Sequence, residues 1–115
     1  MPLQPVIDID ALLAPISDEA PGGSNPRADS SAASLYYRVK DARNAARSAE
    51  RGTLELDAGA PEEWDLVLTS SVTLLSTQAK DLEVASWMTE ALVRLEGFAG
   101  LRDGLTVIRG LVERF

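Results

Sequence analysis

The amino-acid sequence predicts an all-α fold, in which an irregular leader rich in proline and glycine packs on an antiparallel bundle of about four long helices. Three observations lead to this prediction. Residues 62–115 carry apolar side chains at steps of three and four, which is the period of a helix. The short connectors Lys80-Asp81 and Gly97-Phe98-Ala99-Gly100 interrupt that run, and connectors of this length make neighbouring helices antiparallel. Five of the six prolines fall within residues 1–28, where a long helix is therefore excluded.

The leader, residues 1–28, is predicted to be irregular apart from one helical turn. Asp8 is placed to cap that turn, over residues 8–13, and Pro15 stops it. Residues 16–26 contain too much proline and glycine for a helix or a central strand. Because apolar side chains recur through the leader, we expect it to pack on the helical body, residues 29–115. These apolar residues are Val6, Ile9, Leu12, Leu13 and Ile16.

The first long helix is predicted from Asp29 or Ser30 to Arg51, with Gly52 following it as a residue free to adopt a positive φ. One face is an alanine-rich stripe, which allows a neighbouring helix to approach closely but buries only a modest area. The stripe consists of Leu35, Val39, Ala42, Ala46 and Ala49. Residues 53–60 are then predicted to form a loop or an extended segment.

The second long helix is predicted over residues 61–78. Pro61 fits its first position, where the missing N–H costs nothing. Glu62, Glu63 and Asp65 suit the positive end of the helix dipole. We expect this helix to bury Trp64, Val67, Leu68, Ser71, Leu74 and Leu75.

A third helix is predicted over residues 82–96 and a fourth over residues 100–114. Asp81 is expected to cap the third helix, with Lys80 exposed beside it, and Gly97 to end that helix. The residues expected to face the core are Leu82, Ala85, Met88, Ala91, Leu92 and Leu95 in the third helix, and Leu101, Leu105, Ile108 and Val112 in the fourth, with Val107, Leu111 and Phe115 beside them.

The fourth helix also contains three glycines, Gly100, Gly104 and Gly110. Each costs about 1 kcal/mol relative to alanine in a helix interior. We expect close approach between helices to be the reason for their presence.

The composition excludes most catalytic chemistry. The chain contains no histidine and no cysteine, which removes the commonest metal ligand and proton carrier, the thiolate nucleophile and the disulfide. Helix starts and turns account for the paired carboxylates, and residues 21–24 lack the spacing of a phosphate-binding loop. We therefore predict no catalytic, cofactor-binding or metal-binding residues, and a carboxylate-dependent hydrolase is the least favoured class of function.

Charge and hydropathy exclude two kinds of partner. The formal net charge is −7, whereas binding to nucleic acid requires a basic surface that contacts phosphates. No apolar run approaches the roughly 18 residues that cross a bilayer, and the N-terminus carries no secretory signal. We therefore expect a cytoplasmic protein that does not insert directly into a membrane.

The candidate partner-binding residues are basic and aromatic. Residues 36–51 carry a local excess of three positive charges, which forms either a solvated helix face or a dock for an acidic partner. Trp87 falls off the apolar line of the third helix, so it either covers the first helix or stays partly exposed; an exposed tryptophan would suit an interface. The candidates are Tyr37, Arg43, Arg47, Arg51 and Trp87.

Two blocks of the sequence carry a family pattern. The first is Pro15-Ile16-Ser17 followed by Ala20-Pro21-Gly22-Gly23, and the second spans residues 61–115. The most specific positions of the second block are Trp64, Lys80, Asp81, Leu82, Gly97, Gly100 and Leu101. In these blocks the chain resembles the ImpA-related N-terminal domain of TssA-like type VI secretion proteins. The resemblance implies that these specific positions are scaffold residues.

The resemblance further implies a non-enzymatic structural or adaptor domain that works in baseplate and contractile sheath or tube assembly. The implied partners are sheath, inner-tube, baseplate or membrane-complex subunits, and the implied place is the cytoplasmic side of the secretion apparatus. Family members usually continue beyond residue 115, so we expect this chain to be a fragment. Self-association is left open. From the residues alone, the alternative is a small helical regulator or chaperone that binds a client peptide in a groove.

Overall fold

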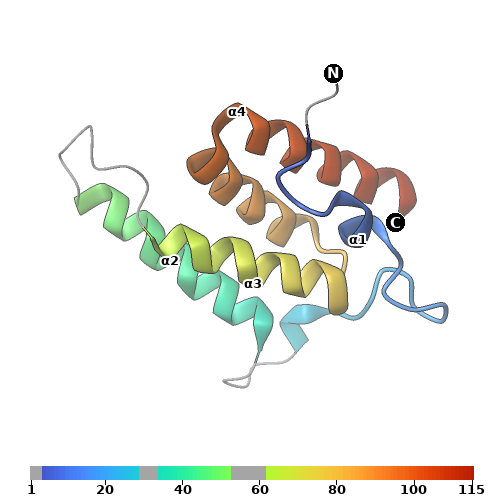
Figure 1. Ribbon diagram of the computed structural model, residues 1–115. Coiled ribbons are helices and arrows are strands. Elements are labelled where there is room, and N and C mark those ends of the chain that lie inside the picture. The colour runs from blue at the N-terminus through green and yellow to red at the C-terminus, as the bar shows by residue number, and fades with distance from the viewer. Residues whose placement is uncertain (1–3, 29–33, 53–61) are drawn as a thin grey trace.

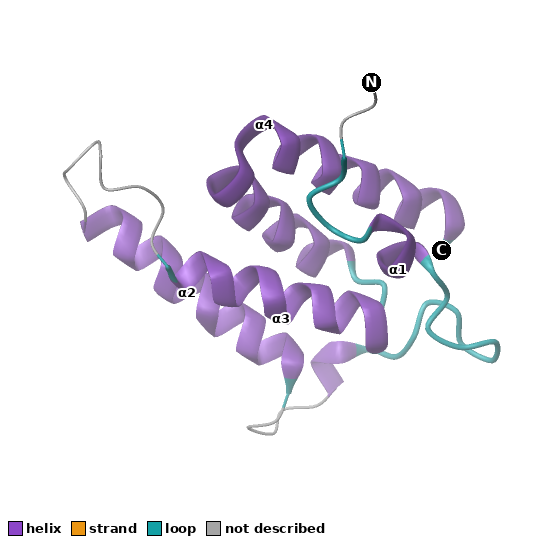
Figure 2. Ribbon diagram, viewed as in Figure 1, coloured by secondary structure: helices purple, strands orange, loops and turns teal. Residues whose placement is uncertain are grey.

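The protein is all-helical wherever its structure is described. The computed structural model describes residues 4–28, 34–52 and 62–115, and Figure 2 shows helices joined by loops over these ranges. In chain order the elements are α1 (Ile9–Leu13), the short 3₁₀ helix η1 (Pro26–Ala28), α2 (Leu35–Gly52), α3 (Glu63–Thr77) and α4 (Leu82–Arg114). The predicted all-α class is confirmed.

The helices form a flat slab whose Cα positions extend 49 × 45 × 16 Å. Helices α2 and α3 lie side by side and antiparallel, and α4 folds back at Gly97 into two halves (Figure 1). α1 lies against both α3 and α4 (Figure 1). The leader thus packs on a bundle made of α2, α3 and the two halves of α4, as predicted. The core contains Leu12, Val39, Trp64, Leu74, Leu75, Met88, Leu92 and Val107.

The caps of α1 and α4 agree with the sequence prediction. The Asp8 carboxylate accepts a hydrogen bond from the backbone N–H of Ala11 at 3.1 Å. The Asp81 carboxylate accepts one from the N–H of Val84 at 3.0 Å. Each bond satisfies one of the N–H groups that the first turn of a helix leaves without a partner.

The start of α2 differs from the prediction. The expected start at Asp29 or Ser30 lies outside the described residues, but Ser34 is non-helical and α2 begins at Leu35. The Ser34 hydroxyl accepts a hydrogen bond from the N–H of Tyr37 at 3.4 Å, so this serine acts as the cap. The predicted face is otherwise correct in its centre, where Val39, Ala42 and Ala46 are buried.

The end of α2 and the start of α3 also need correction. Gly52 is the last helical residue of α2 and does not have a positive φ, so it does not act as the expected terminating residue. The predicted loop over residues 53–60 and the predicted role of Pro61 lie outside the described residues. Glu62 precedes α3 without a side-chain capping bond.

Gly97 is the bend between the two halves of α4. Its φ of 60° and ψ of −135° are accessible to glycine and strongly disfavoured for other residues. The prediction that Gly97 ends a helix is confirmed, but the helix resumes directly after it, so the connector is shorter than the predicted four residues.

The buried face of the second half of α4 is not the predicted one. Leu101, Leu105 and Val112 are exposed, and so is Leu82 at the start of α4. Val107 and Leu111, expected beside that face, are buried, and so are Gly100, Asp103, Gly104 and Gly110. The reason is steric, because at Gly100 and Gly104 the second half of α4 lies too close to its neighbours for a side chain. A Cβ built on Gly100 would come within 2.1 Å of the Leu92 carbonyl oxygen, and one on Gly104 within 2.5 Å of the Thr89 hydroxyl.

We predict that Gly100→Ala destabilises the domain although alanine favours helices. The added methyl group collides with the Leu92 backbone, which cannot move aside as a side chain can. Overpacking of this kind costs about 1–3 kcal/mol, and urea denaturation would measure it as a lower free energy of unfolding. Gly52→Ala is the matched control, because no atom lies within 4 Å of its added Cβ. Equal stabilities of the two variants would contradict the close contact in α4.

Candidate interaction surfaces

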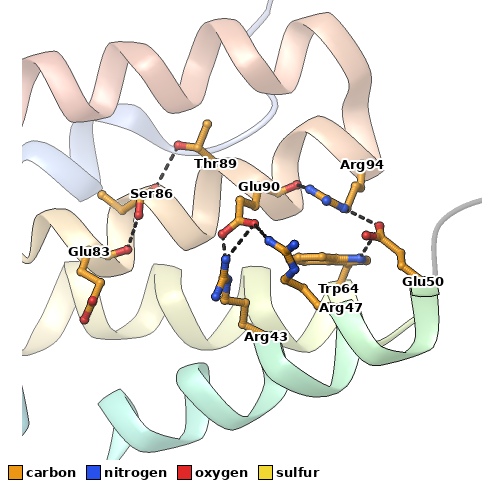
Figure 3. A network of polar contacts seen from close by, with 10 residues as sticks. Arg43, Arg47, Glu50, Trp64, Glu83, Ser86, Thr89, Glu90 and Arg94 are labelled. Atoms are coloured by element: carbon orange, nitrogen blue, oxygen red, sulfur yellow. Dashed lines mark hydrogen bonds and ion pairs between the residues drawn. The ribbon is translucent and has the colours of Figure 1, made fainter. Parts of the chain in front are cut away.

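The predicted basic surface is largely occupied inside the domain. Where α2 faces the first half of α4, Arg43 Nε donates to Glu90 Oε1 at 2.8 Å and Arg47 Nη1 to Glu90 Oε2 at 3.4 Å (Figure 3). Trp87 is 8% exposed, and its ring packs on Tyr36 with the ring centroids 5.6 Å apart. Trp87 thus covers α2, which was one of the two predicted arrangements, and it is not an exposed aromatic.

The remaining two candidates lie at opposite ends of α2. Tyr37 is half-buried, and its ring meets that of Tyr36 edge-on with the centroids 5.1 Å apart. Arg51 is exposed and donates to the Ser48 hydroxyl at 3.2 Å. At 1.5 Å per residue, Tyr37 and Arg51 are about 21 Å apart along the helix. The five candidates therefore do not form one compact surface.

A second polar cluster fixes the other end of α2. The Glu50 carboxylate accepts hydrogen bonds from Arg94 Nε and, at 2.9 Å, from the indole N–H of the fully buried Trp64 (Figure 3). The Arg94 guanidinium lies over the Trp64 ring, 4.3 Å from its centroid. The hydrogen bond from Arg94 is the main reason that the pKa of Glu50 lies below its usual value, because it outweighs burial. Trp64 is thus a core residue, as predicted, and also a hydrogen-bond donor.

Arg27 of η1 links the leader to the start of α4. Its guanidinium bonds to the Asp81 carboxylate at 2.7 and 3.2 Å and to Glu83 at 3.0 Å. The Tyr36 hydroxyl donates to the same Glu83 oxygen at 2.6 Å. The hydrogen bonds from Tyr36 and Arg27 together lower the pKa of Glu83. Asp81 therefore does two tasks, since it caps α4 and holds the leader.

Lys80 is the point at which the leader, α3 and α4 meet. Its Nζ donates to the carbonyl oxygens of Leu12 at 2.7 Å and Leu75 at 2.8 Å. Both carbonyls lie near the C-terminal end of a helix, where backbone oxygens lack partners in the helix and a cation is favourable. Burial lowers the pKa of the Lys80 ammonium. The prediction that Lys80 is exposed is therefore wrong, because the folded leader supplies an acceptor that the sequence does not place beside it.

The glycine pair of the leader lies against the same connector. The Lys80 N–H donates to the Gly22 carbonyl at 2.8 Å, and Gly23 forms an isolated antiparallel bridge with Ala79. Gly23 has a φ of 83°, and a Cβ there would lie 2.0 Å from the Gln78 carbonyl oxygen. Only glycine fits this contact. Through it, the first block of the family pattern, in the leader, packs directly against the second block.

Asp103 is a structural residue that the sequence analysis missed. It is 2% exposed on the glycine face of α4, where its carboxylate accepts from the backbone N–H of Val6 at 2.6 Å and from Arg102 at 2.8 Å. Burial favours the protonated acid, but the bonds from Arg102 and Val6 outweigh it and lower the pKa of Asp103. Its position between Gly100 and Gly104, opposite Leu101 and Leu105, is the sequence feature that could have indicated a buried role.

The largest exposed apolar residues gather on the second half of α4 and its bend. Phe98 is 90% exposed, and Leu101, Leu105 and Val112 follow along the helix. Beside the bend, Val93, Gly97, Phe98 and Leu101 line an open apolar pocket of about 200 Å³. Leu101 and Leu82, both expected to be scaffold residues, thus lie on the surface, whereas Trp64, Lys80, Asp81, Gly97 and Gly100 hold the fold together.

Within the described ranges we also looked for membrane-spanning helices and for clusters of metal ligands. None of the helices there combines the length and the apolar character needed to cross a bilayer. Nor do three or more acidic side chains gather there closely enough to hold a metal ion.

Comparison with known proteins identifies relatives over nearly the whole chain. Residues 13–115 match the family described as "ImpA, N-terminal, type VI secretion system". The chain is 32% identical over 110 residues to type VI secretion system component TssA1 of Pseudomonas aeruginosa, covering 96% of this chain and 30% of that protein. It also resembles a solved N-terminal domain, including the conserved ImpA_N region, of the TssA component from Burkholderia cenocepacia. There the TM-score is 0.66 and the identity 31%, over 99% of this chain and 41% of that chain. This chain thus spans less than half of either relative.

We predict that Lys80→Met loosens the junction between the leader and the body. The variant leaves the Leu12 and Leu75 carbonyls without the ammonium donor, and losing a buried partner costs about 1–3 kcal/mol. Urea denaturation would measure the loss as a lower free energy of unfolding. Lys40→Met is the matched control on exposed α2 surface, with a change expected within about 0.5 kcal/mol. Equal effects of the two changes would argue against the bridging role of Lys80.

The domain should lose stability in acid. Folding lowers the pKa of Glu50 and Glu83 from 4.5 and that of Asp103 from 3.8. The unfolded chain therefore binds more protons in this range, so the free energy of unfolding falls as the pH drops below these ordinary values and through the lower folded-state values. Urea titrations at a series of acidic pH values should show a shallower fall for Glu50→Gln than for the wild type. The exposed Glu113→Gln should retain the wild-type slope, and an unchanged slope in Glu50→Gln would refute the assignment.

Proposed function

This chain belongs to the ImpA N-terminal family of the type VI secretion system, and we propose that it serves there as a structural adaptor that holds other components through protein–protein contacts. The proposed partners are sheath, inner-tube, baseplate or membrane-complex subunits. The proposed site of action is the cytoplasmic side of the apparatus, where such components assemble.

The observation that carries this proposal is the exposed apolar surface at the bend of α4. Phe98 is almost fully exposed next to the pocket formed with Val93, Gly97 and Leu101. A large aromatic side chain in water beside an apolar hollow is a common feature of protein interfaces. The domain's own core does not use these side chains, so they are available to a partner.

A non-enzymatic role is supported by how the charged residues are used. Glu50, Glu83 and Asp103 have lowered pKa values, and each accepts a hydrogen bond from an arginine. For Glu50 and Glu83 the arginine belongs to another element, and for Asp103 it is the preceding residue of the same helix. In addition, the chain has no histidine or cysteine for proton transfer or nucleophilic attack. These groups serve the scaffold, and the exposed surface at the bend of α4 is apolar.

Affinity capture tests the adaptor role. The tagged chain, incubated with lysate of the source bacterium under gentle conditions, should enrich sheath, inner-tube, baseplate or membrane-complex subunits identified by mass spectrometry. Phe98→Asp should reduce this recovery about tenfold or more, because an interface anchor contributes about 2 kcal/mol or more. Leu82→Asp is the matched control, since Leu82 is 50% exposed at the start of the first half of α4, away from the bend.

Recovery of none of these subunits would refute the adaptor role. Calorimetry would compare the affinity of this chain for an assembled sheath with its affinity for one isolated helix of a sheath subunit. Equal affinity for the two would favour a chaperone that binds a client peptide.

A further inference from the structure

The exposed apolar residues of the second half of α4 follow the spacing of a coiled-coil seam. Counted from the bend, they fall at successive steps of three, four, three and four. This is the alternation that places side chains along one line facing a second helix. The residues are Phe98, Leu101, Leu105, Ile108 and Val112, and we call them the α4 seam. Ile108 packs partly against the core, while the others range from 36% exposed at Leu101 to 90% at Phe98.

Only one flank of the α4 seam is open to a partner. On one side lie Gly104 and Leu111, which are buried against the rest of the domain. On the other side lie Arg102 and Arg109, each directly after a seam residue in sequence and four residues after another. A helix that packs on the seam must therefore lie toward the two arginines.

The two arginines keep donors for a partner. Arg109 has an 81% exposed side chain whose Nε donates to Glu113 one turn away at 2.9 Å. An exposed pair of this kind is weak and readily exchanged. Arg102 uses Nε for Asp103 and Nη2 for the Gln4 carbonyl, and its side chain is 37% exposed. The open flank thus carries two arginines against the single carboxylate of Glu113, although the chain as a whole is acidic.

We propose that the α4 seam docks an amphipathic helix of a partner protein that carries the same three–four apolar repeat and acidic residues along its flank. The apolar positions of that helix lie between the seam residues, and one of its large side chains enters the pocket beside Gly97. Its carboxylates face Arg102 and Arg109. This inference rests on the proposed adaptor role and specifies the chemistry of the partner.

A second copy of this chain fits the seam less well. Two antiparallel copies would place the arginine flank of one against the arginine flank of the other, and like charges in contact are unfavourable. Two parallel copies would place those arginines against the flank of Gly104 and Leu111, which each domain already covers. A helix with an acidic flank avoids both conflicts.

The test uses two synthetic helices of about four heptads, with isoleucine and leucine at the seam positions. One carries glutamate at every flanking position and the other carries lysine there, so that self-repulsion keeps each peptide monomeric. Fluorescence anisotropy with the intact chain should show at least tenfold tighter binding of the glutamate peptide. Higher ionic strength should narrow that difference.

Variants of the chain assign the binding to the seam. Leu105→Asp should abolish binding, and Val112→Asp provides a second test if the first variant does not fold, as checked by circular dichroism. Both side chains are more than half exposed, so the core is unaffected. Arg109→Glu should reverse the preference between the peptides, while Leu82→Asp should leave it unchanged.

Three results would overturn the proposal: no binding of either peptide, equal binding of both, or binding that Leu105→Asp and Val112→Asp leave intact. Sedimentation that shows a dimer of the wild type dissociated by Leu105→Asp would assign the seam to a second copy instead. If capture recovers secretion subunits but both peptides fail, the adaptor role stands without this docking site. If capture recovers no secretion subunit but the glutamate peptide binds, the docking site stands and the adaptor role is refuted.

Discussion

The close contact between the two halves of α4 is the constraint on which the rest of the structure depends. Gly97 reverses the chain, and Gly100 then lies directly against the Leu92 backbone. Where the two halves come this close only glycine fits, so the second half of α4 turns the face that carries Gly100 and Gly104 inward. Its large apolar residues are consequently left on the outer face. The exposed seam is thus a direct result of how the core is packed.

The arginines locate the helices relative to one another. Arg27, Arg43 and Arg94 each join a carboxylate on another element. Partly exposed ion pairs contribute little stability one by one, but they require a particular alignment of α2 with α4 and of η1 with the start of α4. The result is an acidic protein whose basic side chains are largely engaged in the fold. The flank of the seam is the place where two arginines border exposed apolar surface.

Local features of the fold were predictable from the sequence. Capping by Asp8 and Asp81, the core position of Trp64 and the bend at Gly97 each depend on a few neighbouring residues. Features that depend on distant segments were not predictable. Lys80 was expected to be exposed because its acceptor on Leu12 belongs to the leader.

The same limit explains the error in the last helix. Hydrophobic periodicity there selects the face of Leu101, Leu105, Ile108 and Val112, with Val107 and Leu111 only beside it. Which face is buried depends on how near the neighbouring segments lie, as the contacts of Gly100 and Gly104 show. Asp103 was missed for the same reason, since its partner Val6 is remote in sequence. For the candidate partner-binding residues, the sequence therefore could not predict which ones are exposed.

The bonds that hold the leader also set the order in which the domain can form. Leu12 is 68 residues from its partner Lys80, and Val6 is 97 residues from Asp103. During synthesis the leader leaves the ribosome before α4, which carries the acceptor of the Val6 N–H. Contacts so far apart in sequence require large loops to close and slow the folding of a helical domain. The leader can therefore complete its contacts only after Lys80 and Asp103 have been synthesised.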